Sequence, residues 1–371
     1  MSKHATPAGT RNYYQRFAGE LASAHFRQAQ ELWLSSIGLG TYLGQPDDRT
    51  DAAYQAAVKR AVALGCNVID TASNYRFQRS ERSLGAAFAS LFADGAVTRE
   101  EIVVTTKGGF VPFDNVPPRG QSDFKRYVEE MFINTGVCAW EDFVQGQHCM
   151  TSKYLAHQLA QSLRNLQLEA VDVYYLHNPE SQLAEVAPDD FYARLHTAFE
   201  FLEEAVAAGK LALYGTATWN GYRVPLNSAE YVSLERVVQT ALAVAGGQHH
   251  FKVVQLPINL AMTEAFTHAN QTLNGQPVTF LEAAAELGIT VMTSGSILQS
   301  RLASGLPPIV NEAFPGLSTD AQRALQFVRS TPGVTTALVG MSQVEHVAEN
   351  LALAKMPPAA TAEYLKLFSK N

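Results

Sequence analysis

A repeated alternation of short apolar runs with longer amphipathic segments limits the possible folds of this chain more than any other feature. The runs begin near residue 36 and are rich in Val, Ile, Leu or Tyr. Because polar residues do not alternate within them, they are typical of strands buried on both faces, as in a parallel sheet. The expected strands span residues 36–40, 67–70, 102–106, 171–176, 213–217, 252–256, 290–294 and 336–340.

The segments between these runs have the periodicity of helices. Residues 51–65 place Ala, Val and Leu at helical spacing and end at Gly65, a favourable residue after a helix. Similar segments span 80–92, 152–166, 191–209, 228–246, 279–288, 318–330 and 343–354. Eight strand–helix repeats favour a closed (β/α)8 TIM barrel over an open doubly wound sheet. Since no linker interrupts the pattern, we expect residues 1–371 to form one domain.

Two stretches lie outside the repeat. Residues 1–35 form an N-terminal extension, with helical character expected over 16–29, that we place across the bottom of the barrel. Residues 108–150 form a long insert after the third strand. A loop of this length is usual for a lid or binding loop. It leaves the barrel at the carboxyl-terminal face of the strands, where TIM-barrel enzymes place their active sites. Its aromatic residues are expected either to cover a ligand or to bury a small core of their own.

Composition excludes several classes of partner. The net charge of -7 and the absence of a basic stripe argue against nucleic acid and anionic membrane surfaces. No apolar run approaches the roughly 20 residues that span a bilayer, and the first residues lack a signal-peptide core. The three cysteines form no CxxC pair, which indicates a reducing compartment. We therefore expect a cytoplasmic protein.

Polar residues close three consecutive expected strands. Asp70 ends the second strand and is soon followed by Tyr75, Lys107 ends the third, and His177 ends the fourth. Each residue alone has an ordinary structural explanation, such as a turn cap or a buried ion pair. Together, on neighbouring strand ends, they predict a proton-transfer site. A metal site is not expected, because the spacing of Cys138, His148 and Cys149 matches no standard zinc motif.

This set of residues suits the protonation of a carbonyl oxygen. When hydride reaches a carbonyl carbon, the resulting alkoxide needs a proton from a nearby acid. Tyr75 is the expected acid, and the Lys107 ammonium is expected to lower its pKa while Asp70 keeps the lysine charged. A neutral His177 is expected to donate a hydrogen bond to the substrate oxygen.

The sequence resembles the aldo-keto reductases from about residue 34 onward. The matching pieces are GLGT (38–41), IDTASNY (69–75), ERSLG (81–85), TTK (105–107), YLHNPE (175–180) and ALVGMSQVEHVAENLA (337–352). The resemblance implies a (β/α)8 barrel, Tyr75 as general acid, and NAD or NADP extended across the carboxyl-terminal face. It implies cofactor contacts from Gly40, Thr41, Tyr42, Asp70, Thr218, Gln255, Ser294, Gly295, Ser296, Gly340, Ser342, Gln343, Glu349 and Asn350, and substrate contacts from Tyr42, Trp140 and Trp219.

Several departures from the family pattern fall on expected cofactor positions. Ala217-Thr218 replaces the Ser-Asn pair that grips the carboxamide, and Ser294 replaces the aromatic residue that stacks on the nicotinamide. Trp219 or an aromatic residue of the insert, Phe110 or Trp140, is a candidate replacement for that stack. Met341, Gln343 and Val347 offer no charge to a 2′-phosphate; the positions of Arg301 and Lys355 are not fixed by the sequence.

The sequence leaves three functions open. The first is an oxidoreductase that interconverts a carbonyl, such as an aldehyde, ketone or sugar, and an alcohol or polyol. The second is a redox-neutral acid–base enzyme, a lyase or isomerase, on the same barrel. The third is a nicotinamide-binding sensor or regulatory subunit, as in the potassium-channel β-subunits. Assembly into a homo-oligomer is compatible with each.

Overall fold

Eight parallel strands close into a barrel in the computed structural model, which describes residues 2–368. The barrel closes where β12 pairs with β3, with Ala337 opposite Ile37. Each strand coincides with one of the expected apolar runs, so the predicted (β/α)8 fold is confirmed. The strands are β3 (Ile37–Gly40), β4 (Val68–Asp70), β5 (Val103–Gly108), β6 (Val171–His177), β7 (Leu211–Ala217), β8 (Phe251–Pro257), β11 (Thr290–Ser294) and β12 (Val334–Gly340).

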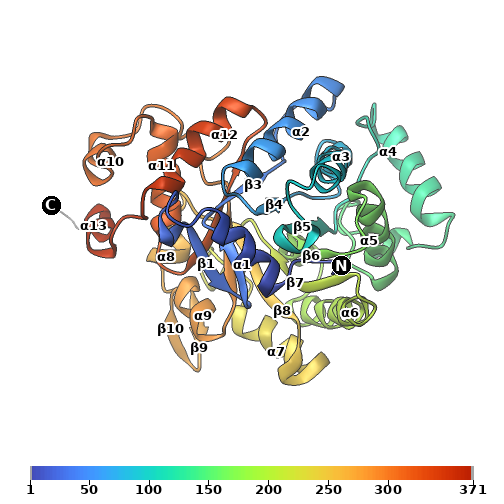
Figure 1. The fold of residues 1–371 in the computed structure, drawn as a ribbon. Helices are drawn as coiled ribbons and strands as arrows, with labels where there is room; N and C mark the ends of the chain where they lie inside the picture. Colours follow the sequence, from blue (N-terminus) through green and yellow to red (C-terminus); the bar gives the residue numbers. More distant parts are fainter. Residues whose placement is uncertain (1, 369–371) are drawn as a thin grey trace.

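Helices surround the strands on the outside of the barrel (Figure 1). They are α2 (Asp48–Ala63), α3 (Arg79–Ala93), α5 (Ser152–Leu166), α6 (Pro188–Ala207), α7 (Leu234–Ala245), α9 (Phe280–Glu286), α11 (Asp320–Ser330) and α12 (Val344–Leu351). The expected start of α7 near residue 228 was wrong. The helix begins after Ser233, whose hydroxyl accepts a hydrogen bond from the Arg236 N–H and so caps the first turn.

The N-terminal extension closes the bottom of the barrel, but its helix is not where the sequence pattern placed it. Helix α1 spans Pro7–Arg16, and most of the segment expected to be helical instead leads into a hairpin of β1 (Phe26–Ala29) and β2 (Leu32–Ser35). The Thr6 hydroxyl caps α1, and Pro7 occupies the first helical position, where its missing N–H costs nothing. Leu34 of β2 packs against the apolar residues inside the barrel. Figure 1 shows α1 and β1 in front of the barrel strands.

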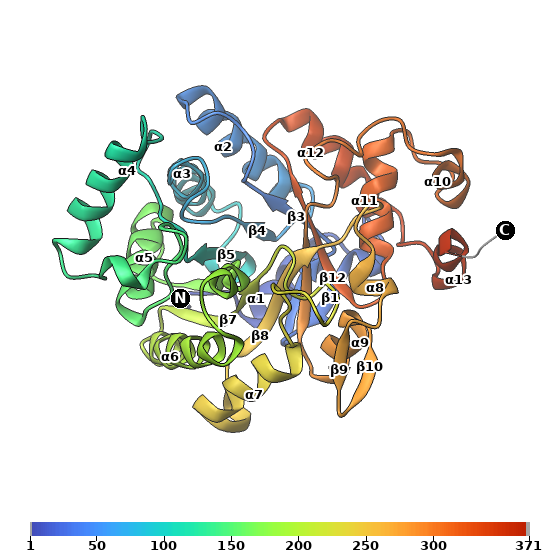
Figure 2. The ribbon, with the colours of Figure 1, turned by 180° about the vertical axis from the view of Figure 1, so that it is seen from behind.

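The insert folds into a unit of its own beside the barrel. It contains α4 (Gln121–Val128), a π-helical turn over Glu129–Ile133 and a 3₁₀ turn over Trp140–Asp142. Its apolar side chains gather around Phe132 and pack on Tyr154 of α5. Figures 1 and 2 both place α4 at the periphery, next to α5. Most of the insert's aromatic residues therefore bury a small core and do not cover the barrel mouth.

Short elements complete the described residues. They are α8 (Glu264–Thr267), the hairpin of β9 (Gln271–Leu273) and β10 (Gln276–Val278), α10 (Pro308–Ala313) and α13 (Thr361–Leu365). A search of residues 2–368 finds no helix that combines the length and apolarity needed to cross a membrane. Over the same residues, no cluster of three His, Cys, Asp or Glu side chains is arranged to hold a metal ion.

Candidate active site

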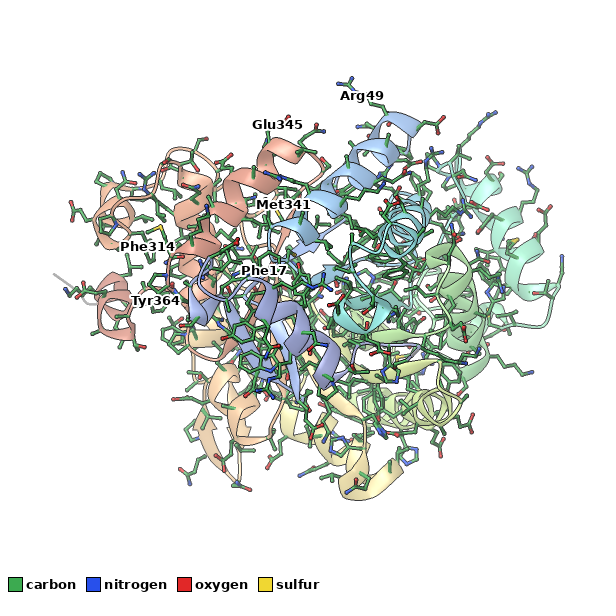
Figure 3. The ribbon with its side chains drawn as sticks, viewed as in Figure 1. Phe17, Arg49, Phe314, Met341, Glu345 and Tyr364 are labelled. Carbon is green, nitrogen blue, oxygen red and sulfur yellow. The ribbon has the colours of Figure 1, made fainter. Side chains whose placement is uncertain are left out.

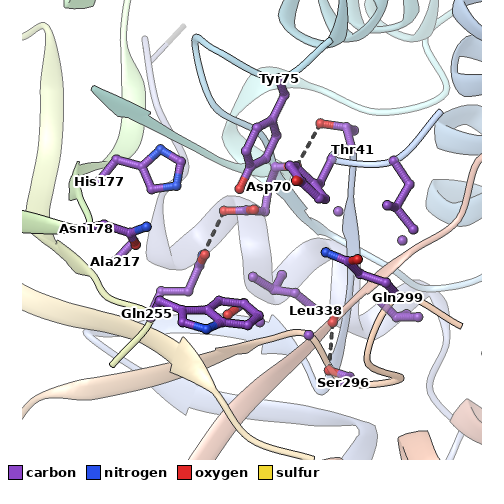
Figure 4. A pocket seen from close by; sticks show the side chains of 18 of the residues that line it. Thr41, Asp70, Tyr75, His177, Asn178, Ala217, Gln255, Ser296, Gln299 and Leu338 are labelled. Carbon is purple, nitrogen blue, oxygen red and sulfur yellow. Dashed lines mark hydrogen bonds between the residues drawn. The ribbon is translucent and has the colours of Figure 1, made fainter. Parts of the chain in front are cut away.

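A cavity of about 410 Å³ opens at the carboxyl ends of the barrel strands. Tyr75, His177 and Gln255 face the same space within it (Figure 4). The strand ends that supply its walls are neighbours in the sheet, because Gly40 pairs with both Asp70 and Gly340, and Ala217 pairs with Gln255. The cavity is lined by Gly40, Thr41, Tyr42, Leu43, Asp70, Asn74, Tyr75, Phe110, His177, Asn178, Ala217, Thr218, Trp219, Gln255, Ser294, Gly295, Ser296, Ile297, Leu298, Gln299, Leu338, Val339 and Gly340.

A buried ion pair forms the floor beneath Tyr75. The Lys107 ammonium donates to both carboxylate oxygens of Asp70, at 2.8 and 2.7 Å, and to the Thr71 carbonyl at 2.8 Å. The Thr105 hydroxyl adds a bond of 2.6 Å to the same carboxylate. Burial lowers the pKa of Lys107, although Asp70 opposes the shift. The expectation that Asp70 holds the lysine in place agrees with this geometry.

Tyr75 lies between this pair and the cavity. The Lys107 Nζ is 5.0 Å from the centre of the Tyr75 ring. Within residues 2–368 the Tyr75 hydroxyl has no hydrogen-bond partner and is available to a ligand. Burial and the Asp70 charge raise the pKa of Tyr75 well above its usual value. The expected net lowering of the Tyr75 pKa was wrong, because burial of the side chain and the Asp70 charge outweigh the attraction of the Lys107 ammonium.

His177 faces Tyr75 across the cavity, with ring centres 5.8 Å apart. Burial and the Lys107 charge lower the pKa of His177 well below its usual value, so the imidazole is neutral as expected. Two residues of the insert, His148 and Phe110, contact His177 and hold it in position. The His148 Nε2 lies 2.8 Å from the His177 carbonyl oxygen, and the Phe110 ring meets the His177 ring edge-on at 5.2 Å.

The start of the insert needs a glycine next to this histidine pair. Gly109 has a φ of 141°, and a Cβ there would lie 2.8 Å from the His148 Nε2. The other ring nitrogen of His148 lies 2.8 Å from the Gln182 Nε2. The insert thus contributes to the wall behind His177, a role that the sequence did not reveal.

The loop that follows Tyr75 is also held by residues that the sequence did not single out. Arg76, Phe77 and Gln78 all have left-handed φ angles, between 48° and 68°. The Arg76 guanidinium donates to the Gln45 carbonyl at 2.9 Å and to Asp51 at 2.6 Å. Three successive non-glycine residues in this region are strained. The anchor supplied by Arg76 offsets that strain and fixes the position of Tyr75.

Gln255 is committed to the ion pair. Its Nε2 donates to the Asp70 Oδ1 at 2.8 Å, as drawn in Figure 4. Thr218 lies on the neighbouring strand end and donates its N–H to the Gln255 carbonyl at 2.9 Å. The Thr218 hydroxyl oxygen is buried and has no partner in the described part of the chain. A free, buried hydroxyl that lines a cavity is the kind of group that a ligand satisfies.

The expected cofactor residues divide into two groups. Those at the strand ends line the cavity: Gly40, Thr41, Tyr42, Asp70, Thr218, Gln255, Ser294, Gly295, Ser296 and Gly340. Ser342, Gln343, Glu349 and Asn350, expected at the adenosine end, do not line it. Glu349 accepts a hydrogen bond of 2.5 Å from the Thr319 hydroxyl.

The residues expected at the adenosine end include no lysine or arginine. Met341 and Val347 are fully buried, and Glu345 is exposed on α12 (Figure 3). Neither Arg301 nor Lys355 lines the cavity. In fact its lining contains no Lys or Arg among the described residues.

The two tryptophans expected to contact substrate lie in different places. Trp219 lines the cavity, and its backbone is fixed because the buried Glu180 carboxylate accepts its N–H at 2.6 Å while Arg223 donates to its carbonyl at 3.0 Å. Trp140 packs against Phe143 in the core of the insert, with ring centres 6.1 Å apart. The expectation that Trp140 reaches the site was wrong, because the insert turns its aromatic residues toward α5.

Comparison with known proteins defines the class. The sequence model described as the Aldo/keto reductase family matches residues 36–231, more than half of the chain. This chain therefore belongs to the aldo/keto reductase family. The sequence resemblance to that family is confirmed.

Individual relatives show how the similarity is distributed. A putative voltage-gated potassium channel subunit beta of Schizosaccharomyces pombe is 23% identical over 90% of this chain and 89% of the relative. The NADH-specific methylglyoxal reductase of Escherichia coli is 25% identical over 57% of this chain, and only 60% of that relative is covered. A Klebsiella pneumoniae aldo/keto reductase crystallised with NADP and acetate superposes with a TM-score of 0.61 over 94% of this chain and 98% of its own, at 22% identity.

Proposed function

We propose that this protein is a nicotinamide-dependent oxidoreductase that reduces an aldehyde, ketone or sugar to an alcohol, or catalyses the reverse reaction. One observation carries the proposal: the unpartnered Tyr75 hydroxyl faces the cavity, opposite His177 and above the Asp70–Lys107 pair. A hydroxyl in this position serves a reaction in which an oxygen gains or loses a proton. Family membership supports the same class of chemistry.

The residues of this chain have distinct roles in the proposed reduction. Tyr75 is protonated at neutral pH because its pKa is raised, so it can give its proton to the carbonyl oxygen. The tyrosinate that remains lies close to the Lys107 ammonium, which stabilises it. His177 is neutral and has ring nitrogens free to orient the same oxygen. Tyr42 and Trp219 offer aromatic surface to the rest of the substrate.

The lining of the cavity fits the nicotinamide half of a dinucleotide, which would supply the hydride when bound. The orphaned Thr218 hydroxyl and the glycines at positions 40, 295 and 340 leave polar groups and open backbone along the strand ends. We propose that these positions hold the nicotinamide half, and that Ser342, Gln343, Glu349 and Asn350 lie toward the adenosine half. Because the residues expected at that end include no lysine or arginine, and Glu345 of the same segment is acidic, we propose that NADH is preferred to NADPH.

The proposed function is tested by titrating the purified protein with NADH and NADPH while following thermal stability. Binding of NADH, with turnover of small aldehydes, ketones or sugars, is the expected result. If neither dinucleotide shifts the unfolding temperature at millimolar concentration, the proposal is wrong and a redox-neutral use of the proton site is favoured.

Similarity to the channel β-subunit over nine-tenths of the chain favours a second candidate, a regulatory subunit that binds the same dinucleotide. Turnover separates the two. A purely regulatory protein would bind NADH and show no carbonyl-dependent oxidation of it. The three free cysteines support the proposal that either protein works in a reducing compartment such as the cytoplasm.

A further inference from the structure

Asn178 is the first residue beyond β6 and points into the cavity. Its φ of 45° is left-handed, a conformation that Asn tolerates better than most residues. Its N–H donates to the Ala217 carbonyl at 2.6 Å, which fixes the backbone against the end of β7. Figure 4 shows Asn178 beside Ala217 and below His177.

The Asn178 amide has no partner of its own. No hydrogen bond joins it to another side chain or carbonyl within residues 2–368, although it lines the cavity. An amide offers one carbonyl acceptor and an NH₂ donor. Both are available to a ligand.

The free Thr218 hydroxyl lies on the adjacent strand end. His177 and Ala217 are paired across β6 and β7, so Asn178 and Thr218 are each one residue beyond a paired position. Strands in a sheet are about 4.8 Å apart, so Asn178 and Thr218 lie on neighbouring strand ends, and both line the cavity. On the next strand the Gln255 Nε2 is already bonded to Asp70. Among the described residues, the uncommitted polar groups in this part of the cavity thus include, besides the His177 ring assigned to the substrate oxygen, the Asn178 amide and the Thr218 hydroxyl.

We propose that Asn178, with Thr218, recognises the carboxamide of the nicotinamide ring. A primary carboxamide carries a carbonyl acceptor and an NH₂ donor, so it can form two reciprocal hydrogen bonds with the Asn178 side chain. The Thr218 hydroxyl can then bond to the carboxamide N–H or carbonyl lone pair that Asn178 does not use. This assignment explains how the site retains carboxamide recognition although Ala217 has no polar side chain. It rests on the proposed use of a nicotinamide dinucleotide.

The test compares NAD⁺ with 3-acetylpyridine adenine dinucleotide, in which a methyl ketone replaces the carboxamide and removes only the NH₂ donor. Affinities are measured by calorimetry on the unaltered protein, Asn178→Gly and Thr218→Val. Glycine accepts the left-handed φ, so Asn178→Gly removes the amide without straining the backbone. Asn74→Ala is the matched control, because Asn74 also lines the cavity and has a buried, unpartnered Oδ1.

We expect the unaltered protein to bind NAD⁺ about tenfold more tightly than the analogue, since an unpaired polar group in the site is penalised. Asn178→Gly should reduce that ratio to about twofold or less, Thr218→Val should reduce it in part, and Asn74→Ala should leave it unchanged. A ratio that stays near tenfold in Asn178→Gly overturns the inference while leaving the proposed function intact. Failure of the unaltered protein to bind either dinucleotide overturns both.

Discussion

The ammonium group of Lys107 donates all its hydrogen bonds to the Asp70 carboxylate and the Thr71 carbonyl, and none to Tyr75, which lies above it. Its contacts to the Asp70 oxygens and to Thr71 lie between 2.7 and 2.8 Å. Lys107 therefore acts on Tyr75 through its charge, across the 5.0 Å that separates it from the ring centre. The pair holds the proton site in place and also stabilises the barrel interior.

Asp70→Asn should destabilise the protein strongly. It leaves the Lys107 ammonium buried without its counter-charge, and removal of one partner of a buried ion pair costs about 3–5 kcal/mol. Urea unfolding at pH 7 measures this change. The control is Asp123→Asn, which breaks an exposed ion pair with Arg126 and should cost less than about 1 kcal/mol.

The double variant Asp70→Asn/Lys107→Met separates charge from packing. Because it removes both charges, we expect it to be more stable than Asp70→Asn alone. A double variant that is less stable than the single one would show that the ion pair is not the source of the loss.

Tyr75→Phe should lower kcat by about 1,000-fold, within the range of a lost general acid. Affinity for NADH should change by less than about twofold, since the ring and its packing are retained. Steady-state kinetics and calorimetry measure the two quantities. A variant with an undiminished kcat would remove Tyr75 from the mechanism.

The raised pKa of Tyr75 has a consequence for the pH dependence of carbonyl reduction. The protonated form is the acid, so its rate contribution is lost only as pH rises through that raised pKa. We expect the kcat for reduction to stay level from pH 7 to about pH 9, below the ordinary tyrosine value near 10. A fall in kcat between pH 7 and 8 that is absent in Tyr75→Phe would indicate a lowered pKa instead.

The strands and the proton site were predictable because they depend on local patterns. A continuous apolar run in the sequence predicts a strand buried on both faces, and the structure has strands at these runs. Asp70, Lys107 and His177 each lie at the carboxyl end of such a run. Parallel neighbours then bring their carboxyl ends together without further information.

What the sequence did not predict depends on contacts between distant residues. Gln255 bonds to Asp70 across 185 positions, a contact that engages the Nε2 donor of the amide expected to hold a cofactor. The aromatic residues of the insert indicate that it forms a core, but the sequence does not show whether that core faces the barrel mouth or α5. Trp140 was therefore wrongly placed at the cavity. The direction of Asn178 follows from one left-handed φ angle, which the Asn-Pro pair does not predict, because a residue before proline favours extended backbone.

The corrected positions of the tryptophans predict opposite effects on binding and stability. Trp219→Ala should raise KM about tenfold, since it removes aromatic surface from the cavity wall, and should change stability little because the side chain is 42% exposed. Trp140→Ala should leave KM unchanged and lower the unfolding temperature, because it removes a side chain from the core of the insert. Kinetics and thermal unfolding of both variants check the pair. If KM changed in Trp140→Ala but not in Trp219→Ala, the insert would contact the substrate and act as a lid.

Buried neutral histidines should make the protein sensitive to acid. His25 is fully buried, with one ring nitrogen 2.9 Å from the Gly65 carbonyl and the other 3.1 Å from the Ser36 hydroxyl, and burial lowers its pKa to about 3. Between pH 6.5 and 3 the unfolded chain binds a proton here that the folded chain does not. The free energy of unfolding therefore falls as pH drops through this window, by about 1.4 kcal/mol per pH unit for this residue.

The variant His25→Gln should be less stable than the unaltered protein at pH 7 but should lose stability more gradually from pH 6 to 4. His346→Gln, at an exposed position on α12, should follow the unaltered protein. Urea unfolding at intervals across this range measures the slopes, and equal slopes for His25→Gln and the unaltered protein would show that the imidazole is protonated in the folded state.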